Sequence, residues 1–259
     1  MVVLAPGRDR FDMGRVVQRA VDSLKLNLVN FALVAIIVFA VPKILLDVLR
    51  VLITPHTLGA QMSPGVAGFS FVFSLVSLFL GCIVQAAIVK ASVEGRRDSV
   101  GDMIAIGLRF GLPLLGLTIL LVIALMVGFI LLIVPGVILA IVWSVTTPAV
   151  VLEGTGVFGS FGRSSALTRG SRWSIFLLYL LWGLAIIVVS MILLAPFGFG
   201  VGLMRAGGLS GMLVIYTVIA AVWSTVITIL QTVLVASIYS ELRMIKEGVA
   251  PGGVAQTFD

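Results

Sequence analysis

Long apolar runs alternate with short clusters of charged residues along the chain. No Asp, Glu, Lys or Arg occurs between Arg109 and Glu153, a run of 43 residues that is too long for one membrane helix and suits two helices with a tight turn. Pro135 and Gly136 predict the position of that turn. Four further apolar runs predict single spans at 26–41, 66–89, 173–195 and 212–239. The pattern therefore predicts about six transmembrane helices.

An internal repeat groups these six spans into three hairpins. A short amphipathic segment precedes each odd-numbered span, at 11–25, 100–110 and 157–169, and a proline follows it. The prolines are Pro42, Pro135 and Pro196, and the returning spans close on Glu94, Glu153 and Glu241. Helices of this kind favour the headgroup plane of a membrane. The alternatives are that hairpin topology alone produces this order, and that the amphipathic segments are simply cytoplasmic extensions of the spans that follow them.

These features predict an all-α polytopic membrane bundle of three hairpins, each introduced by an amphipathic interfacial helix. We expect a cytoplasmic N-terminal segment at 1–25, a six-span membrane domain at 26–246 and a short cytoplasmic tail at 247–259. After the first span, Lys43, Asp47 and Arg50 follow at helical spacing, which indicates a helix that emerges at the headgroups. The stretches 54–65 and 197–202 predict external loops because they are rich in glycine, proline or both.

Composition supports the membrane assignment. The 259 residues are 60% hydrophobic and 11% charged, whereas soluble domains carry about 25% charged residues. Too few charges remain to cover a water-facing surface, and no soluble catalytic domain fits beside six spans.

The distribution of charge predicts orientation. Of the 17 Lys and Arg residues, 14 fall on the side of the spans that holds both termini. Positive residues concentrate in cytoplasmic loops, so we expect a bacterial-type inner membrane protein with both termini in the cytoplasm. The net charge of +6 then reflects membrane orientation instead of nucleic-acid binding, and the expected partners are anionic membrane lipids.

The candidate chemistry argues against an enzyme. No zinc-protease, serine-hydrolase, paired-cysteine or nucleotide-binding motif is present. The single histidine, His56, falls in a predicted loop, and the single cysteine, Cys82, falls in an apolar run. We therefore expect no metal and no cofactor.

A few polar residues remain inside the predicted spans. Gln85 and Gln231 precede similar apolar sequences in the second and sixth spans and are candidates to line a solute path. Interhelical hydrogen bonding is the simpler expectation for these glutamines and for the hydroxyl residues in the spans, while Pro148 predicts a bend in the fourth span. The hydroxyl residues are Ser144, Thr146, Thr147, Ser224, Thr225 and Thr228.

The region from Pro148 to Trp173 resembles a known family. The pattern consists of Glu153, Gly156, Arg163-Ser164, Leu167-Thr168, Gly170 and then Trp173 at the start of a span. It is similar to the glycerophosphoryl diester phosphodiesterase membrane domain and to related bacterial inner-membrane proteins. The likeness covers about 26 residues, and the six-span layout extends it. Some members of that family carry a fused phosphodiesterase domain, so the resemblance implies a membrane module without the catalytic part.

The same region has two physical interpretations. Hydroxyl and guanidinium groups bind phosphate well, so a lipid phosphate site is a hypothesis for Arg163, Ser164, Thr168, Arg169 and Arg172. Alternatively, Gly170 ends a helix in the left-handed conformation and Ser171 caps the next one.

The sequence thus favours a non-catalytic membrane module that binds or organises lipid or scaffolds a partner protein. A second copy of the chain is also a possible partner. The alternative is a channel or facilitator for a small or lipidic solute.

Overall fold

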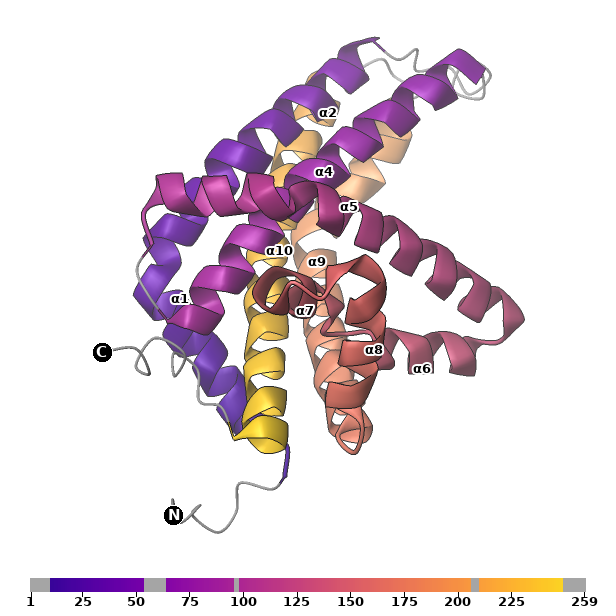
Figure 1. Ribbon diagram of the computed structural model, residues 1–259. Coiled ribbons are helices and arrows are strands. Elements are labelled where there is room, and N and C mark those ends of the chain that lie inside the picture. Colours follow the sequence, from indigo (N-terminus) through magenta and orange to yellow (C-terminus); the bar gives the residue numbers. More distant parts are fainter. Residues whose placement is uncertain (1–9, 54–63, 96–97, 206–209, 249–259) are drawn as a thin grey trace.

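The computed structural model describes residues 10–53, 64–95, 98–205 and 210–248, and nearly all of them are helical (Figure 1). No strand occurs in these four ranges. In this part of the chain six helices are long and apolar enough to cross a membrane: Met13–Arg50, Pro64–Glu94, Val100–Leu131, Ile133–Glu153, Arg172–Leu194 and Val214–Glu247. The predicted all-α class with six spans is confirmed, and these helices indicate an integral, multi-pass membrane protein.

The described part of the chain forms a series of helices. They are α1 (Met13–Ala35), the π-helical segment η1 (Ile36–Ala40), α2 (Val41–Ile53), α4 (Pro64–Glu94), α5 (Val100–Leu131), α6 (Ile133–Val142), α7 (Thr146–Glu153), α8 (Gly156–Thr168), α9 (Arg172–Arg205) and α10 (Ser210–Glu247).

Two of the three predicted interfacial helices are not separate elements. Residues 11–25 contain the start of α1, which continues through η1 into α2 and crosses the predicted boundary at residue 25 without a break. Residues 100–110 are likewise the first turns of α5. Only the third segment is a helix of its own, α8, because glycines with positive φ lie before it at Gly154 (φ +62°) and after it at Gly170 (φ +91°).

The reversal between α5 and α6 occurs at Leu132, so its predicted position at Pro135 and Gly136 was wrong. Leu132 has an extended backbone (φ −167°, ψ 149°). Pro135 lies in the first turn of α6, where a missing N–H leaves no helical bond unmade. A Cβ on Gly136 would lie 2.6 Å from the ring of Phe129, so the two helices approach each other closely at this glycine.

The fourth span is interrupted. α6 ends at Val142 and α7 begins at Thr146, with a turn at 143–145 between them. Pro148 is the third residue of α7, so its missing N–H leaves the carbonyl of Ser144 without a helical donor. The bend predicted from Pro148 is thus a break just before it.

The fifth span extends further than expected. The backbone of α9 stays helical to Arg205, so the loop predicted at 197–202 was wrong. A helix satisfies its own backbone hydrogen bonds, which matters more in lipid than the intrinsic cost of glycine. The other predicted loop, with His56, falls mainly on residues 54–63, which lie outside the described part.

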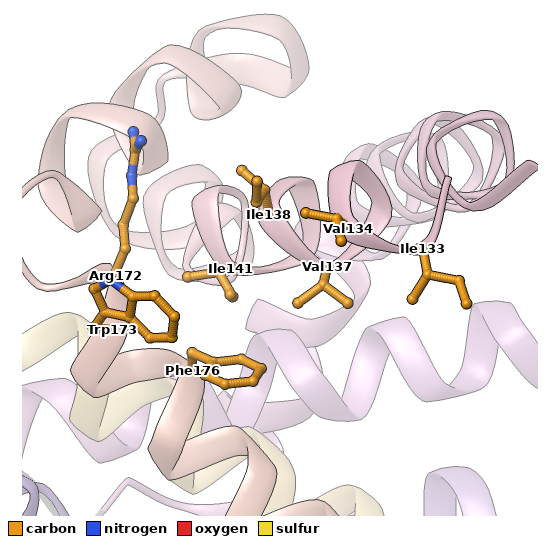
Figure 2. Close-up of a pocket in the computed structure, with 8 residues that line it drawn as sticks. All are labelled: Ile133, Val134, Val137, Ile138, Ile141, Arg172, Trp173 and Phe176. Carbon is orange, nitrogen blue, oxygen red and sulfur yellow. The ribbon is translucent and has the colours of Figure 1, made fainter. Parts of the chain in front are cut away.

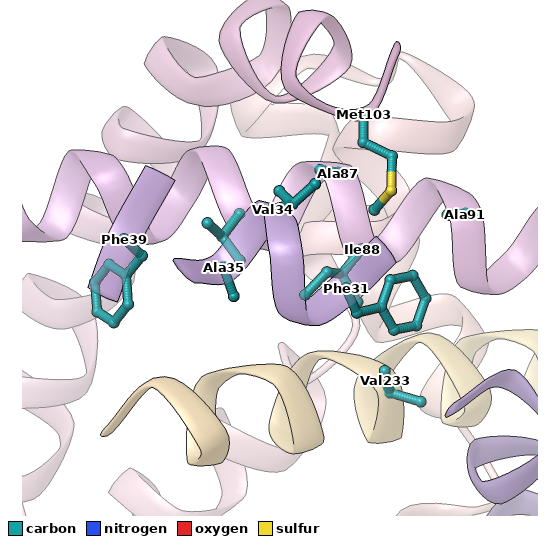
Figure 3. Packing of buried hydrophobic residues seen from close by; sticks show 10 residues of the cluster. Phe31, Val34, Ala35, Phe39, Ala87, Ile88, Ala91, Met103 and Val233 are labelled. Atoms are coloured by element: carbon teal, nitrogen blue, oxygen red, sulfur yellow. The ribbon is translucent and has the colours of Figure 1, made fainter. Parts of the chain in front are cut away.

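The principal core joins the first, second and last spans (Figure 3). Side chains of α1 and η1 pack against one face of α4, with Met103 of α5 and Val233 of α10 closing the cluster. Its buried members are Phe31, Val34, Ala35, Phe39, Val84, Ala87, Ile88, Ala91, Met103 and Val233. These contacts make α1, α4 and α10 the packed centre of the bundle.

The remaining spans expose more apolar surface. In the most apolar 18-residue stretch of each helix, only 6% of the residues of α9 and 17% of those of α5 are buried inside the molecule. Large aliphatic side chains cover the outer faces of α5, α6 and α9, such as Ile130, Ile133 and Ile192. Lipid tails solvate such surfaces, as expected of membrane helices that lie at the periphery of a bundle.

Candidate functional site

A buried carboxylate on α10, near the end of the chain, forms ion pairs with two arginines of α1, near its start. Glu241 of α10 has no exposed surface. Arg15 of α1 donates to its Oε1 from Nε at 2.9 Å and from Nη2 at 2.6 Å, and Nη1 of Arg19 lies 3.0 Å from its Oε2. Removing a carboxylate from water costs several kcal/mol unless cations compensate it. The two arginines supply that compensation and fix α1 against α10.

A second ion cluster joins α7, α8 and α10. Arg163 donates to Glu153 from Nε at 2.6 Å and from Nη2 at 2.8 Å, and the Tyr239 hydroxyl donates to Oε1 of Glu153 at 2.5 Å. Arg163 also bonds to Glu247, whose other oxygen accepts from Nε of Arg243 at 2.9 Å. The bonds to Glu153 raise the pKa of the Arg163 guanidinium above its ordinary value. The contacts with Glu247 act in the same direction against the lowering effect of burial.

The carboxyl-terminal part of α10 is therefore bound to α1, α7 and α8 through ion pairs and hydrogen bonds. The sequence marked Glu153 and Glu241 only as repeated span ends, and it gave no sign that arginines distant in the chain neutralise them. Arg163, proposed from sequence as a phosphate ligand, has its guanidinium occupied by two carboxylates in this structure.

The proposed phosphate-binding hydroxyls face the interior. Ser164 and Thr168 of α8 are fully buried beside the break in the fourth span. The Ser164 hydroxyl donates to the carbonyl of Val142 at 2.8 Å and accepts from the N–H of Val145 at 3.3 Å. The Thr168 hydroxyl donates to the carbonyl of Ser164 at 2.9 Å. Both hydroxyls therefore bind backbone groups, and Ser164 satisfies those of the interrupted helix.

Ser164→Ala should lower the free energy of unfolding by about 1–3 kcal/mol, because the buried N–H of Val145 loses its partner and the carbonyl of Val142 keeps only the longer bond from the Thr168 hydroxyl at 3.4 Å. Unfolding by titration of the detergent-solubilised protein with sodium dodecyl sulfate measures this loss. Ser165→Ala is the matched control, since Ser165 is half-buried and its side chain makes no hydrogen bond with any described residue. Equal losses for the two variants would contradict this role of Ser164.

Three exposed cations gather where α8 meets α9. Arg169 and Arg172 flank the corner glycine, Gly170, whose φ of +91° agrees with the predicted helix end. Lys246 of α10 is nearby, with its Nζ 3.9 Å from the position of a Cβ on Gly170. None of the three makes an ion pair or a side-chain hydrogen bond within the described part of the chain. We call Arg169, Arg172 and Lys246 the basic corner; sequence reasoning missed Lys246 because its proximity depends on the tertiary fold.

The intramembrane glutamines lie apart from this corner. Gln85 is half-buried on α4 and Gln231 is half-buried on α10, and neither side chain makes a hydrogen bond with a described residue. Val233 and, one turn earlier, Ile229 are the α10 residues that pack against the α1 and α4 core. Two residues of helix turn Gln231 about 160° away from Val233. The structure therefore does not bring the two amides together at that contact.

The hydroxyl groups of Ser224, Thr225 and Thr228 in the last span bond within their own helix, which corrects the expectation of interhelical bonds for these three residues. Thr225 donates to the carbonyl of Ala221 at 2.8 Å, and Thr228 donates to that of Ser224 at 2.8 Å. Ser224 itself donates to Ala221 at 2.8 Å. Such back-bonding satisfies a hydroxyl in lipid without a partner helix.

Comparison with known protein families shows which family the chain belongs to. The model of a family described as a domain of unknown function (DUF7847) matches residues 14–242. The chain therefore belongs to this family. No curated protein and no solved structure matches it. The family description does not mention the glycerophosphoryl diester phosphodiesterase membrane domain, so that resemblance stays a prediction.

Proposed function

We propose that this member of the DUF7847 family is a non-catalytic membrane module that binds anionic lipid through the basic corner. The observation that carries the proposal is a contrast in pairing. The arginines of the two ion clusters are bound to carboxylates, whereas Arg169, Arg172 and Lys246 are exposed and make no ion pair with a described residue. Cations that do not hold the fold together are available for a ligand.

The position of the corner suits a lipid headgroup. Arg172 is the first residue of α9, and the following residue, Trp173, is 78% exposed. Tryptophan concentrates at membrane interfaces, and guanidinium groups bind phosphate through two parallel hydrogen bonds. With the orientation predicted from the charge imbalance, the corner faces the cytoplasmic leaflet of a bacterial-type inner membrane, where anionic lipids are found.

The bonds of the carboxylates of Glu153 and Glu241 support a non-catalytic role. Glu241 is enclosed between α1 and α10, and the Glu153 carboxylate accepts hydrogen bonds from both Arg163 and the Tyr239 hydroxyl. These bonds join neighbouring helices, so both carboxylates have a structural role. The module could then organise lipid for, or serve as a scaffold to, a separate protein.

The double variant Arg169→Gln, Arg172→Gln tests the proposal. Each cation near a charged membrane surface contributes about 1 kcal/mol, so the loss of two should weaken the binding of phosphatidylglycerol by about thirtyfold. Titration of a fluorescent phosphatidylglycerol into the detergent-solubilised protein measures the Kd. The control, Lys25→Gln with Arg109→Gln, removes the same charge from exposed positions on α1 and α5. Equal weakening by the two double variants would reduce the effect to net charge and overturn the site.

A further inference from the structure

An apolar groove lies between α6 and α9 and opens beside the basic corner. Its volume is about 530 Å³, and its lining consists of α6 residues between Ile133 and Ile141 together with Trp173 and Phe176 of α9. Among the described residues that line the groove, Arg172 is the one with a charge (Figure 2).

The groove has a polar end and an apolar end. Figure 2 shows Ile141, Trp173 and Arg172 at one end and Ile133 at the other, with Val137 and Phe176 between them. From residue 133 to residue 141, α6 rises about 12 Å. The rings of Trp173 and Phe176 meet edge to face, with centroids 5.7 Å apart, and form the α9 wall. The groove is thus elongated and lined by hydrocarbon, with a cation at one end.

We propose that this groove holds one acyl chain of the anionic phospholipid whose phosphate binds at Arg172. The inference rests on the proposed function and makes it more specific, because it turns a charged surface into a site for a single lipid. A phospholipid has the same arrangement as the groove, an anion joined to a flexible hydrocarbon chain. An apolar helix from another protein would fill the groove but leave Arg172 without an anion, so a lipid satisfies both ends.

Anchoring at two points separates this lipid from the annular lipids around the other spans. Each methylene withdrawn into the groove from a less apolar setting adds to affinity, and two such groups correspond to about tenfold in binding. The lipid should therefore stay bound in detergent. Glycerol 1-phosphate, which has the phosphate without the chain, should not displace it.

Photo-crosslinking in nanodiscs tests the inference with the full chain. The probe is phosphatidylglycerol with a diazirine on one acyl chain, and mass spectrometry of the peptides locates the adducts. We expect adducts concentrated on residues 133–141 and 173–176. Adducts spread evenly over the exposed faces of α5 and α9 would overturn the groove. This result comes from the wild-type protein, so it does not depend on the folding of a variant.

A substitution that fills the groove provides a second test in the same crosslinking experiment. Val137→Trp should lower the yield of groove adducts by about tenfold, whereas Leu184→Trp, at an exposed position of α9 outside the groove, should leave it unchanged. An unchanged yield with Val137→Trp would overturn the inference.

The failures of the two proposals can be told apart. If Val137→Trp changes neither the adducts nor the Kd while loss of Arg169 and Arg172 still weakens binding, the groove is wrong and the basic corner stands. If a diazirine phosphatidylcholine labels the groove as well as phosphatidylglycerol does, the preference for anionic lipid is wrong and the acyl-chain site stands.

Discussion

Replacement of Arg15 and Arg19 by methionine should lower the free energy of unfolding by about 3–5 kcal/mol, because it leaves the carboxylate of Glu241 buried without a cation. Glu241 has no exposed surface, and both arginines lie within 3.0 Å of it. Methionine keeps an apolar stem of similar length, so most of the packing remains. Titration with sodium dodecyl sulfate, followed by circular dichroism, measures the loss.

A third substitution separates charge from packing. Adding Glu241→Gln to the double variant should restore much of the stability, since the uncompensated charge is gone. Lys90→Met is the control for loss of a cation. Lys90 pairs with Glu94 at 3.9 Å with both side chains about one-third exposed, so its loss should cost less than about 1 kcal/mol. If Glu241→Gln fails to restore stability, the ion cluster is not what fixes α1 to α10.

Gly107→Ala should be the most damaging single methyl addition in α5, with a loss of about 1–3 kcal/mol in the free energy of unfolding. A Cβ at this position would lie 2.6 Å from the backbone oxygen of Ile83 in α4 and 2.6 Å from its Cγ2. The backbone oxygen cannot move aside as a side chain can. The two helices must separate, and the buried contacts on either side of Ile83 loosen.

Gly116→Ala is the matched control on the same helix. A Cβ there meets no atom within 4 Å, so alanine should leave stability within about 1 kcal/mol of the wild type, on the stabilising side. The same titration measures both variants. If the two glycines tolerate alanine equally, the close approach of α4 and α5 at Gly107 is wrong.

The spans were predictable because lipid imposes a simple requirement on sequence. A helix that crosses a membrane needs about 20 apolar residues, and the runs between charge clusters provided them. The exact ends were harder to predict. Pro135 marked a turn three residues too late, because proline is accepted in the first turn of a helix as readily as in a loop. The glycines at 197–202 suggested a loop, yet the helix continues through them.

The site was only partly predictable. Arg169 and Arg172 were expected to bind phosphate and do lie exposed at a corner, but Ser164 faces the interior and Arg163 pairs with Glu153. Local sequence cannot show which arginine meets a carboxylate from another helix. The sequence does contain one signal for a close helix contact. Gly107 and Gly111 have the small-residue spacing that is typical of tightly packed membrane helices. Their closest neighbour across the contact is Ile83.

Native mass spectrometry of the wild-type protein tests most directly the central claim, that the protein binds anionic lipid. The detergent-solubilised protein is mixed with equal amounts of phosphatidylglycerol and phosphatidylcholine, and the bound lipids are counted by mass. The three cations of the basic corner predict that the first bound lipid is phosphatidylglycerol, with a preference of tenfold or more at about 1 kcal/mol for each cation. Equal occupancy by the two lipids would contradict the claim.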